Sequence, residues 1–163
     1  MLQPISTFPR QSRIWIYQTD IEISVSNQEQ IKRLTNQFLS TWAAHGQDLK
    51  ASCDIKQGHF LIIVADENFN AASGCSIDSQ FRFVQGIGKE FDIDFFKRSN
   101  LAFEKNGKII FIDMKEIKAA IESGQIHADD TFFNNNVSTI DELSEKWRVK
   151  VDESWLKRYF TNS

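Results

Sequence analysis

The chain has 163 residues, 41% of them hydrophobic, and 19 Lys and Arg against 22 Asp and Glu give a net charge of -3. This composition excludes a disordered chain, and the absence of a strong basic excess argues against a nucleic-acid partner. No apolar run approaches the roughly 18 residues that cross a bilayer, and the N-terminal sequence lacks the apolar core of a signal peptide. We therefore expect a cytoplasmic protein with no membrane insertion.

The first half of the sequence predicts an arm, a strand and a helix. Residues 1–12 contain both prolines and are expected to form a loosely ordered arm. Residues 13–18 are apolar and aromatic, which favours a strand. Ser26 or Asn27 then offers a helix cap, and Gly46 is expected to end the helix. Apolar residues recur between them at helical spacing: Ile31, Leu34, Phe38, Leu39 and Trp42.

Two extended runs and a second helix follow. Residues 49–56 and 59–65 flank Gln57-Gly58, a pattern typical of a hairpin. The second run lacks polar alternation, which indicates a central strand covered on both faces. A helix is predicted over 78–91, and the two glycines inside it each cost about 1 kcal/mol relative to alanine. We expect these glycines, Gly86 and Gly88, to allow close packing on a neighbouring element, with a break in the helix as the alternative.

The C-terminal part begins with a second hairpin. Asn106-Gly107, between runs 101–105 and 108–113, is the strongest turn signal in the chain. A helix is expected over 114–123. A short strand at 131–133 and two short helices follow it.

This element order predicts an α+β fold. The first six elements run β-α-β-β-α-β, as in a ferredoxin-like (split βαβ) antiparallel sheet with packed helices. Residues 13–163 would form a single domain, with a sheet core over 13–113 and a helical extension, containing an extra strand, over 114–163. In this topology one edge of the sheet gathers segments that are distant in sequence: Arg13, His45-Gly46, Lys50, 66–67 and 73–78.

The segment Ala72 to Asp78 is the main candidate site. Small residues before a helix leave backbone N–H groups free for an anion, which the helix dipole also favours. We expect a small anionic ligand here, with Lys50 or Arg13 supplying positive charge. The expected ligand-binding residues are Arg13, Lys50, Ser73, Gly74, Ser76 and Asp78.

Cys75 lies in the same segment and is the candidate nucleophile, with His45 as its base. A plainer interpretation stays open: Ser76 or Asp78 caps the helix, Cys75 fills a small buried space, and His45 meets the carbonyls of a helix end. Whether the protein is an enzyme is left undecided. Cys and His residues show no metal-ligand spacing, so neither a metal nor a cofactor is expected.

Two other functions are considered. A non-enzymatic interaction module would use the C-terminal region around Trp155 and Phe160, or an unpaired sheet edge. The apolar run before Asp66-Glu67 resembles a Walker B strand, but that motif requires a P-loop, GxxxxGK[ST]. Gly88-Lys89 does not supply one, because the earlier glycine position holds Phe83 and Glu90 follows.

The sequence also resembles a known family. The resemblance spans about Arg13 to Phe160, and it rests on the following residues: Trp15-Ile16-Tyr17-Gln18, Trp42, His45-Gly46, Leu49-Lys50-Ala51-Ser52, Asp66-Glu67, Ala72 to Asp78, Phe133-Asn134-Asn135, Ser154-Trp155 and Arg158. The chain is similar to an uncharacterised family of short bacterial proteins, many of which carry the label "ABC transporter ATPase". The resemblance implies no activity, substrate or catalytic residue. Because the sequence lacks both the P-loop and the LSGGQ-type signature, we reject an ATPase function.

Overall fold

The computed structural model describes residues 3–160 and confirms an α+β fold with antiparallel sheets. The chain divides into two compact units, which are described separately below. The first contains the residues up to Phe96 together with Ser138–Asp141, and the second contains Lys97–Val137 and the residues from Glu142 onward. Among residues 3–160, no helix combines the length and apolar character that crossing a bilayer requires.

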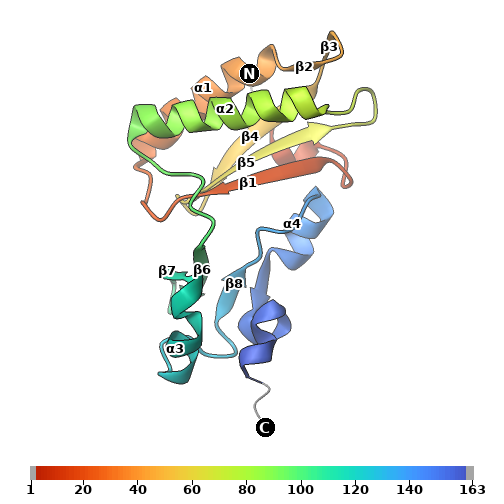
Figure 1. Ribbon diagram of the computed structural model, residues 1–163. Helices are drawn as coiled ribbons and strands as arrows, with labels where there is room; N and C mark the ends of the chain where they lie inside the picture. Colours follow the sequence, from red (N-terminus) through yellow and green to blue (C-terminus); the bar gives the residue numbers. More distant parts are fainter. Residues whose placement is uncertain (1–2, 161–163) are drawn as a thin grey trace. The chain divides into compact units, whose positions relative to one another are not determined.

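The first unit is built on a three-stranded antiparallel sheet of order β1-β5-β4 (Figure 1). As predicted, the central strand is buried along its whole length. The elements of this unit are η1 (Ile5–Thr7), β1 (Arg13–Gln18), α1 (Val25–Ser40), β2 (Ala43–Ala44), β3 (Gln47–Asp48), β4 (Lys50–Lys56), β5 (Phe60–Asp66) and α2 (Gly74–Phe91).

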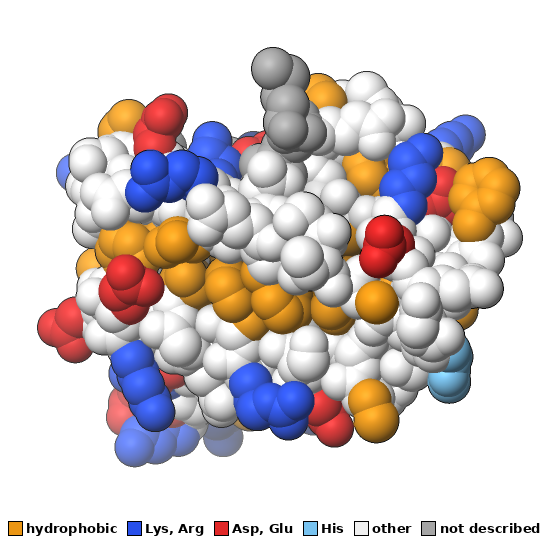
Figure 2. Space-filling model, turned by 90° about the horizontal axis from the view of Figure 1, so that it is seen from above, with side chains coloured by type: hydrophobic (Ala, Val, Ile, Leu, Met, Phe, Trp, Pro, Cys, Tyr) orange, Lys and Arg blue, Asp and Glu red, His pale blue; other side chains and the backbone are white. Residues whose placement is uncertain are grey.

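Helices α1 and α2 cover one face of this sheet, and their buried side chains form one core with it (Figure 1). Between the helices, the rings of Phe38 and Phe83 stack with centroids 4.4 Å apart and stay half-buried. Figure 2, which looks onto the helices, shows hydrophobic side chains gathered in a band across this face.

The end of α1 differs from the prediction. The helix begins after Ser24, whose hydroxyl accepts the N–H of Asn27, and it ends at Ser40 rather than at Gly46. Gly46 instead belongs to the turn of the β2–β3 hairpin, where His45 and Gly46 have φ angles of 53° and 76°. A glycine with positive φ serves a helix end and a tight hairpin equally well, so the sequence pattern did not distinguish them.

The second unit is a four-stranded antiparallel sheet of order β7-β6-β8-β9 with short helices. Its elements are β6 (Asn100–Lys105), β7 (Lys108–Asp113), η2 (Met114–Glu116), α3 (Ile117–Glu122), β8 (Thr131–Phe133), β9 (Arg148–Lys150), η3 (Val151–Glu153) and η4 (Trp155–Tyr159). Helix α4 (Ile140–Lys146) begins in the first unit and continues into the second. The predicted turn at Asn106-Gly107 joins β6 to β7, and a separate apolar core packs beneath the sheet.

The ferredoxin-like sheet is therefore not completed. Strand β6 pairs with β7 and β8 rather than with β1. The outer edge of β1 instead pairs with the segment Ser138–Asp141: the N–H of Ile14 donates to Ser138 O, and the N–H of Ile140 donates to Ser12 O, at 2.9 and 3.1 Å. Because the hairpin after Phe96 has its own partner strands and its own core, it forms a second unit instead of extending the first sheet.

The predicted division at residue 113 and the loose arm over 1–12 are also corrected. The boundary between the units falls after Phe96, and the C-terminal part contributes two strands as well as helices. In the arm, Ile5 and Phe8 are buried, and Ser52 Oγ donates a hydrogen bond to Gln3 O. Apolar side chains therefore hold the arm in place. Residues 1–2 of the arm and 161–163 of the extension lie outside the described residues.

Candidate functional site

Two segments that are distant in sequence, the β2–β3 hairpin and the stretch from Asn70 to Ser76, meet at the N-terminus of α2. The buried indole of Trp42 donates from Nε1 to Ser76 O at 2.8 Å, which joins the start of the β2–β3 hairpin to the first turn of α2. In the loop before α2, the side-chain amide of Asn70 donates to the carbonyls of Ala44 and Gln47, at 3.2 and 2.9 Å. These hydrogen bonds fix the hairpin and the loop beside the helix end.

A capping box organises this helix end. Ser73 Oγ accepts the N–H of Ser76 at 3.1 Å, and Ser76 Oγ accepts the N–H of Ser73 at 2.7 Å. Both hydroxyls, predicted to bind a ligand, are thus committed to the helix cap. Asp78, the other predicted cap, lies exposed in the helix and does not cap it.

The capping box gives no hydrogen-bond acceptor to the N–H groups of Gly74 and Cys75 at this end. The first N–H groups of a helix have no intrahelical acceptor, and the capping box satisfies neither of these two. Both residues are exposed, and the first turn contains no acidic side chain. A Cβ added to Gly74 would meet nothing within 4 Å, so the space beside this residue is open.

The two candidate catalytic residues are both exposed. Cys75 lies in the first turn of α2, so the interpretation of this cysteine as a buried filler is wrong. His45 lies at the tip of the β2–β3 hairpin and not in the last turn of a helix. No hydrogen bond between the two side chains is found within residues 3–160. The hydrogen bonds of Trp42 and Asn70 bring their elements side by side.

The two predicted basic residues lie on opposite faces of the sheet. The Arg13 guanidinium lies 4.7 Å from the ring centroid of Trp15, whose ring in turn meets that of Trp42 edge-on at 5.8 Å. Arg13 is therefore on the face covered by α1 and α2. The ammonium of Lys50 lies 5.7 Å from the ring centroid of Phe8, on the face where η1 meets β4. The structure does not bring Lys50 to the N-terminus of α2.

The acidic pair at the end of β5, Asp66 and Glu67, stabilises the loop that follows. Asp66 Oδ1 accepts the N–H of Asn68 at 3.0 Å, and Glu67 Oε2 accepts the N–H of Ala72 at 2.7 Å. These contacts account for Asp66-Glu67 without a nucleotide. At the tip of the same turn, Phe69 is 85% exposed, the most of any large hydrophobic residue among those described.

The second cysteine is sequestered. Cys53 is buried on β4, and its thiol lies 3.8 Å from Lys32 O. Burial, with a smaller contribution from neighbouring Asp54, raises the pKa of the Cys53 thiol to about 12. Cys53 therefore stays a neutral thiol near neutral pH, and Cys75 is the exposed thiol of the protein.

Trp155, the anchor of the alternative function, is partly packed. It is 37% exposed and meets Phe132 edge-on at 6.3 Å, while the next residue, Leu156, is fully buried. Arg158 stacks over the Trp155 ring at 5.2 Å. The tail is thus attached to the second unit through Leu156, and the Trp155 indole stays partly exposed.

Sequence reasoning missed a polar cluster in the second unit, formed by Lys105, His127 and Asp130. These residues are separated along the chain and match no motif, so no sequence signal pointed to them. Within residues 3–160, no three His, Cys, Asp or Glu side chains come together as a metal ion would require.

Comparisons of the chain with protein-family models, with curated proteins and with solved structures find no match. The family resemblance given above stays a prediction.

Proposed function

We propose that the first unit binds a small anionic ligand at the N-terminus of α2, through the N–H groups of Gly74 and Cys75. The observation that carries the proposal is that Gly74 and Cys75 are exposed residues and that their N–H groups remain after the capping box has satisfied those of Ser73 and Ser76. The macrodipole of an 18-residue helix adds positive potential at the same point. Of the two predicted basic residues, Arg13 lies on the face of the sheet that α2 covers. Lys50 and the hydroxyls of Ser73 and Ser76 are no longer proposed as ligand-binding groups.

The geometry of the surrounding segments supports the same proposal. Trp42 and Asn70 tie the hairpin and the loop to the helix end, so the two donors need little reordering when a ligand binds. A small oxyanion, such as phosphate or a carboxylate, matches a pair of adjacent main-chain donors. The open space at Gly74 gives the ligand access.

A proline substitution at Gly74 tests the proposal by removing a single donor. Ser73 has φ -94° and ψ 168°, the extended conformation that a following proline prefers, and the first turn of a helix tolerates proline. We expect Gly74→Pro to fold and to bind inorganic phosphate about tenfold more weakly than the unmodified chain, because a charge-assisted hydrogen bond is lost. Titration calorimetry with phosphate measures this.

Gly74→Ala is the matched control, because it keeps the N–H group and its Cβ meets no neighbouring atom. This variant should bind phosphate as the unmodified chain does. Equal affinity in the alanine and proline variants, or no saturable binding to the unmodified chain, would overturn the proposal.

The catalytic form of the proposal makes Cys75 a nucleophile beside the bound anion, with His45 as its base. Iodoacetamide should label Cys75 in the folded protein near neutral pH and should leave Cys53 unlabelled until the chain is denatured. If His45 is the base, His45→Ala should slow labelling of Cys75 several-fold, whereas His127→Ala in the second unit should not. Peptide mapping by mass spectrometry measures the labelling of Cys53 and of Cys75. A Cys75 that does not react would remove the catalytic form and leave anion binding untouched.

A further inference from the structure

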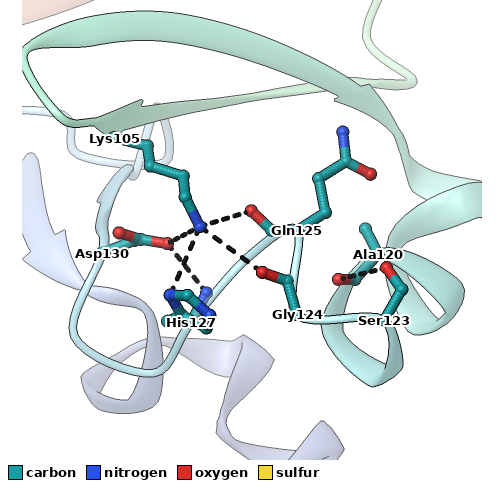
Figure 3. Close-up of polar contacts among 7 residues, drawn as sticks. All are labelled: Lys105, Ala120, Ser123, Gly124, Gln125, His127 and Asp130. Atoms are coloured by element: carbon teal, nitrogen blue, oxygen red, sulfur yellow. Dashed lines mark hydrogen bonds and ion pairs between the residues drawn. The ribbon is translucent and has the colours of Figure 1, made fainter.

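Lys105, the last residue of β6, directs its ammonium into the loop between α3 and β8 (Figure 3). Its Nζ lies 2.8 Å from Gln125 O and 3.5 Å from Gly124 O. It also lies 3.3 Å from His127 Nδ1 and 3.5 Å from Asp130 Oδ2. Four hydrogen-bond acceptor atoms from residues 124–130 thus surround one ammonium group. The Lys105 side chain is only 22% exposed.

The chemistry of these groups is that of a site for a small cation. An ammonium group has three donors and no acceptor, so its contact with His127 is a hydrogen bond in which Nδ1 accepts. Asp130 Oδ2 accepts the backbone N–H of His127 at 2.8 Å and faces the ammonium at the same time. Two carbonyls, one carboxylate oxygen and one imidazole nitrogen would repel one another without a cation among them.

The same loop holds the C-terminal tail through backbone hydrogen bonds. Val151 donates its N–H to Asp130 O at 2.9 Å, and Asp152 donates its N–H to Ala128 O at 3.0 Å. These residues form η3, which leads directly into η4. Val151 and Leu156, one from each of these helices, are fully buried in the core of the second unit. An unbroken series of contacts therefore runs from Lys105 through the loop to the tail.

We propose that residues 124–130 form a binding site for a small monovalent cation, which the Lys105 ammonium fills from within the chain, and that this occupancy latches the C-terminal tail to the second unit. Removal of the charge opens the loop and loosens η3 and η4. A free cation that donates hydrogen bonds, such as the ammonium ion, can take the place of Nζ.

Hydrogen exchange followed by mass spectrometry tests the latch. In Lys105→Ala, peptides covering 124–130 and 150–160 should exchange about tenfold faster than in the unmodified chain, the factor that about 1.4 kcal/mol represents. Ammonium chloride should restore slow exchange, whereas tetramethylammonium chloride at equal ionic strength should not, because that ion has no N–H donor. Lys108→Ala is the control: Lys108 lies across the same hairpin, is exposed, and pairs with Lys105 in the strand register.

Faster exchange in Lys105→Ala that both salts reverse equally would refute the cation site, since only ionic strength would be acting. If the alanine variant does not fold, Lys105→Met keeps a long aliphatic side chain and removes the ammonium group. Unchanged exchange of the tail in Lys105→Met would overturn the latch. Adding Asp130→Asn to Lys105→Ala should abolish the rescue by ammonium, and persistence of that rescue would contradict the assigned site.

Discussion

Gly88→Ala is expected to lower the free energy of unfolding by about 2 kcal/mol, although alanine favours a helix over glycine. Gly88 is buried near the end of α2, where the chain reverses at Asp92 with φ 56°. The N–H of Ile93 donates to Gly88 O at 2.7 Å, and a Cβ on Gly88 would overlap the carbonyl oxygen of Ile93. The methyl group meets backbone, which cannot rotate away, so the returning chain must shift. Urea denaturation followed by circular dichroism measures the loss.

Gly86→Ala, in the same helix, is the matched control. Gly86 is exposed, and a Cβ there meets nothing within 4 Å. This variant should raise the free energy of unfolding by about 0.5–1 kcal/mol, because alanine loses less backbone entropy than glycine when the helix folds. If both glycines tolerate alanine equally, the close approach of Ile93 to α2 is wrong.

Trp42→Ala should cost about 3–5 kcal/mol, the range for truncating a large buried aromatic residue. Trp42 is 3% exposed and packs between Trp15 and Phe38, with ring centroids 5.8 and 6.3 Å away. Its indole N–H also donates the hydrogen bond to Ser76 O that joins the hairpin to α2. Chemical denaturation gives the stability, and phosphate titration of the same variant should show weaker binding, because the helix end loses its support.

Trp42→Phe separates the two contributions of this residue. It keeps most of the packing and removes the N–H donor to Ser76 O, so its cost should be about 1–2 kcal/mol. A phenylalanine variant as unstable as the alanine variant would contradict the packing described here. An alanine variant with unchanged stability would contradict the burial of the indole.

Local patterns predicted most of the secondary structure. The Asn106-Gly107 turn and the apolar strand β5 were recognisable because each depends only on neighbouring residues. The ends of the helices were harder, since the sequence did not reveal that Ser73 and Ser76 cap each other. Gly46 ended no helix, because the chain used its positive φ for a hairpin.

The division into two units could not be predicted from such patterns. Which strands pair is decided by contacts between distant residues, and the hairpin β6–β7 fits the edge of a first sheet as well as a sheet of its own. The pairing of β8 with β6 at Phe103 and Phe132 places the hairpin in a sheet of its own. No feature within the hairpin itself encodes that choice.

The candidate site was predicted in part. The sequence predicted that His45-Gly46 and residues 73–78 lie at one edge of the sheet, and the structure places the β2–β3 hairpin beside the N-terminus of α2. Lys50 was misplaced because alternate residues of a strand point to opposite faces, and its face was not fixed by the sequence pattern. The cluster of Lys105, His127 and Asp130 was missed because its residues come from the end of a strand and from a loop. None of the three forms a recognisable motif with its sequence neighbours.

The most direct measurement of the central claim is the amide spectrum of the ¹⁵N-labelled protein during titration with inorganic phosphate. Binding at the N-terminus of α2 predicts saturable shifts that are largest for the amides of Gly74 and Cys75, with those of Ser73 and Ser76 moving less, since the capping box already holds them. Shifts spread over exposed lysines, or no shift at Gly74 and Cys75 up to saturation, would contradict the account.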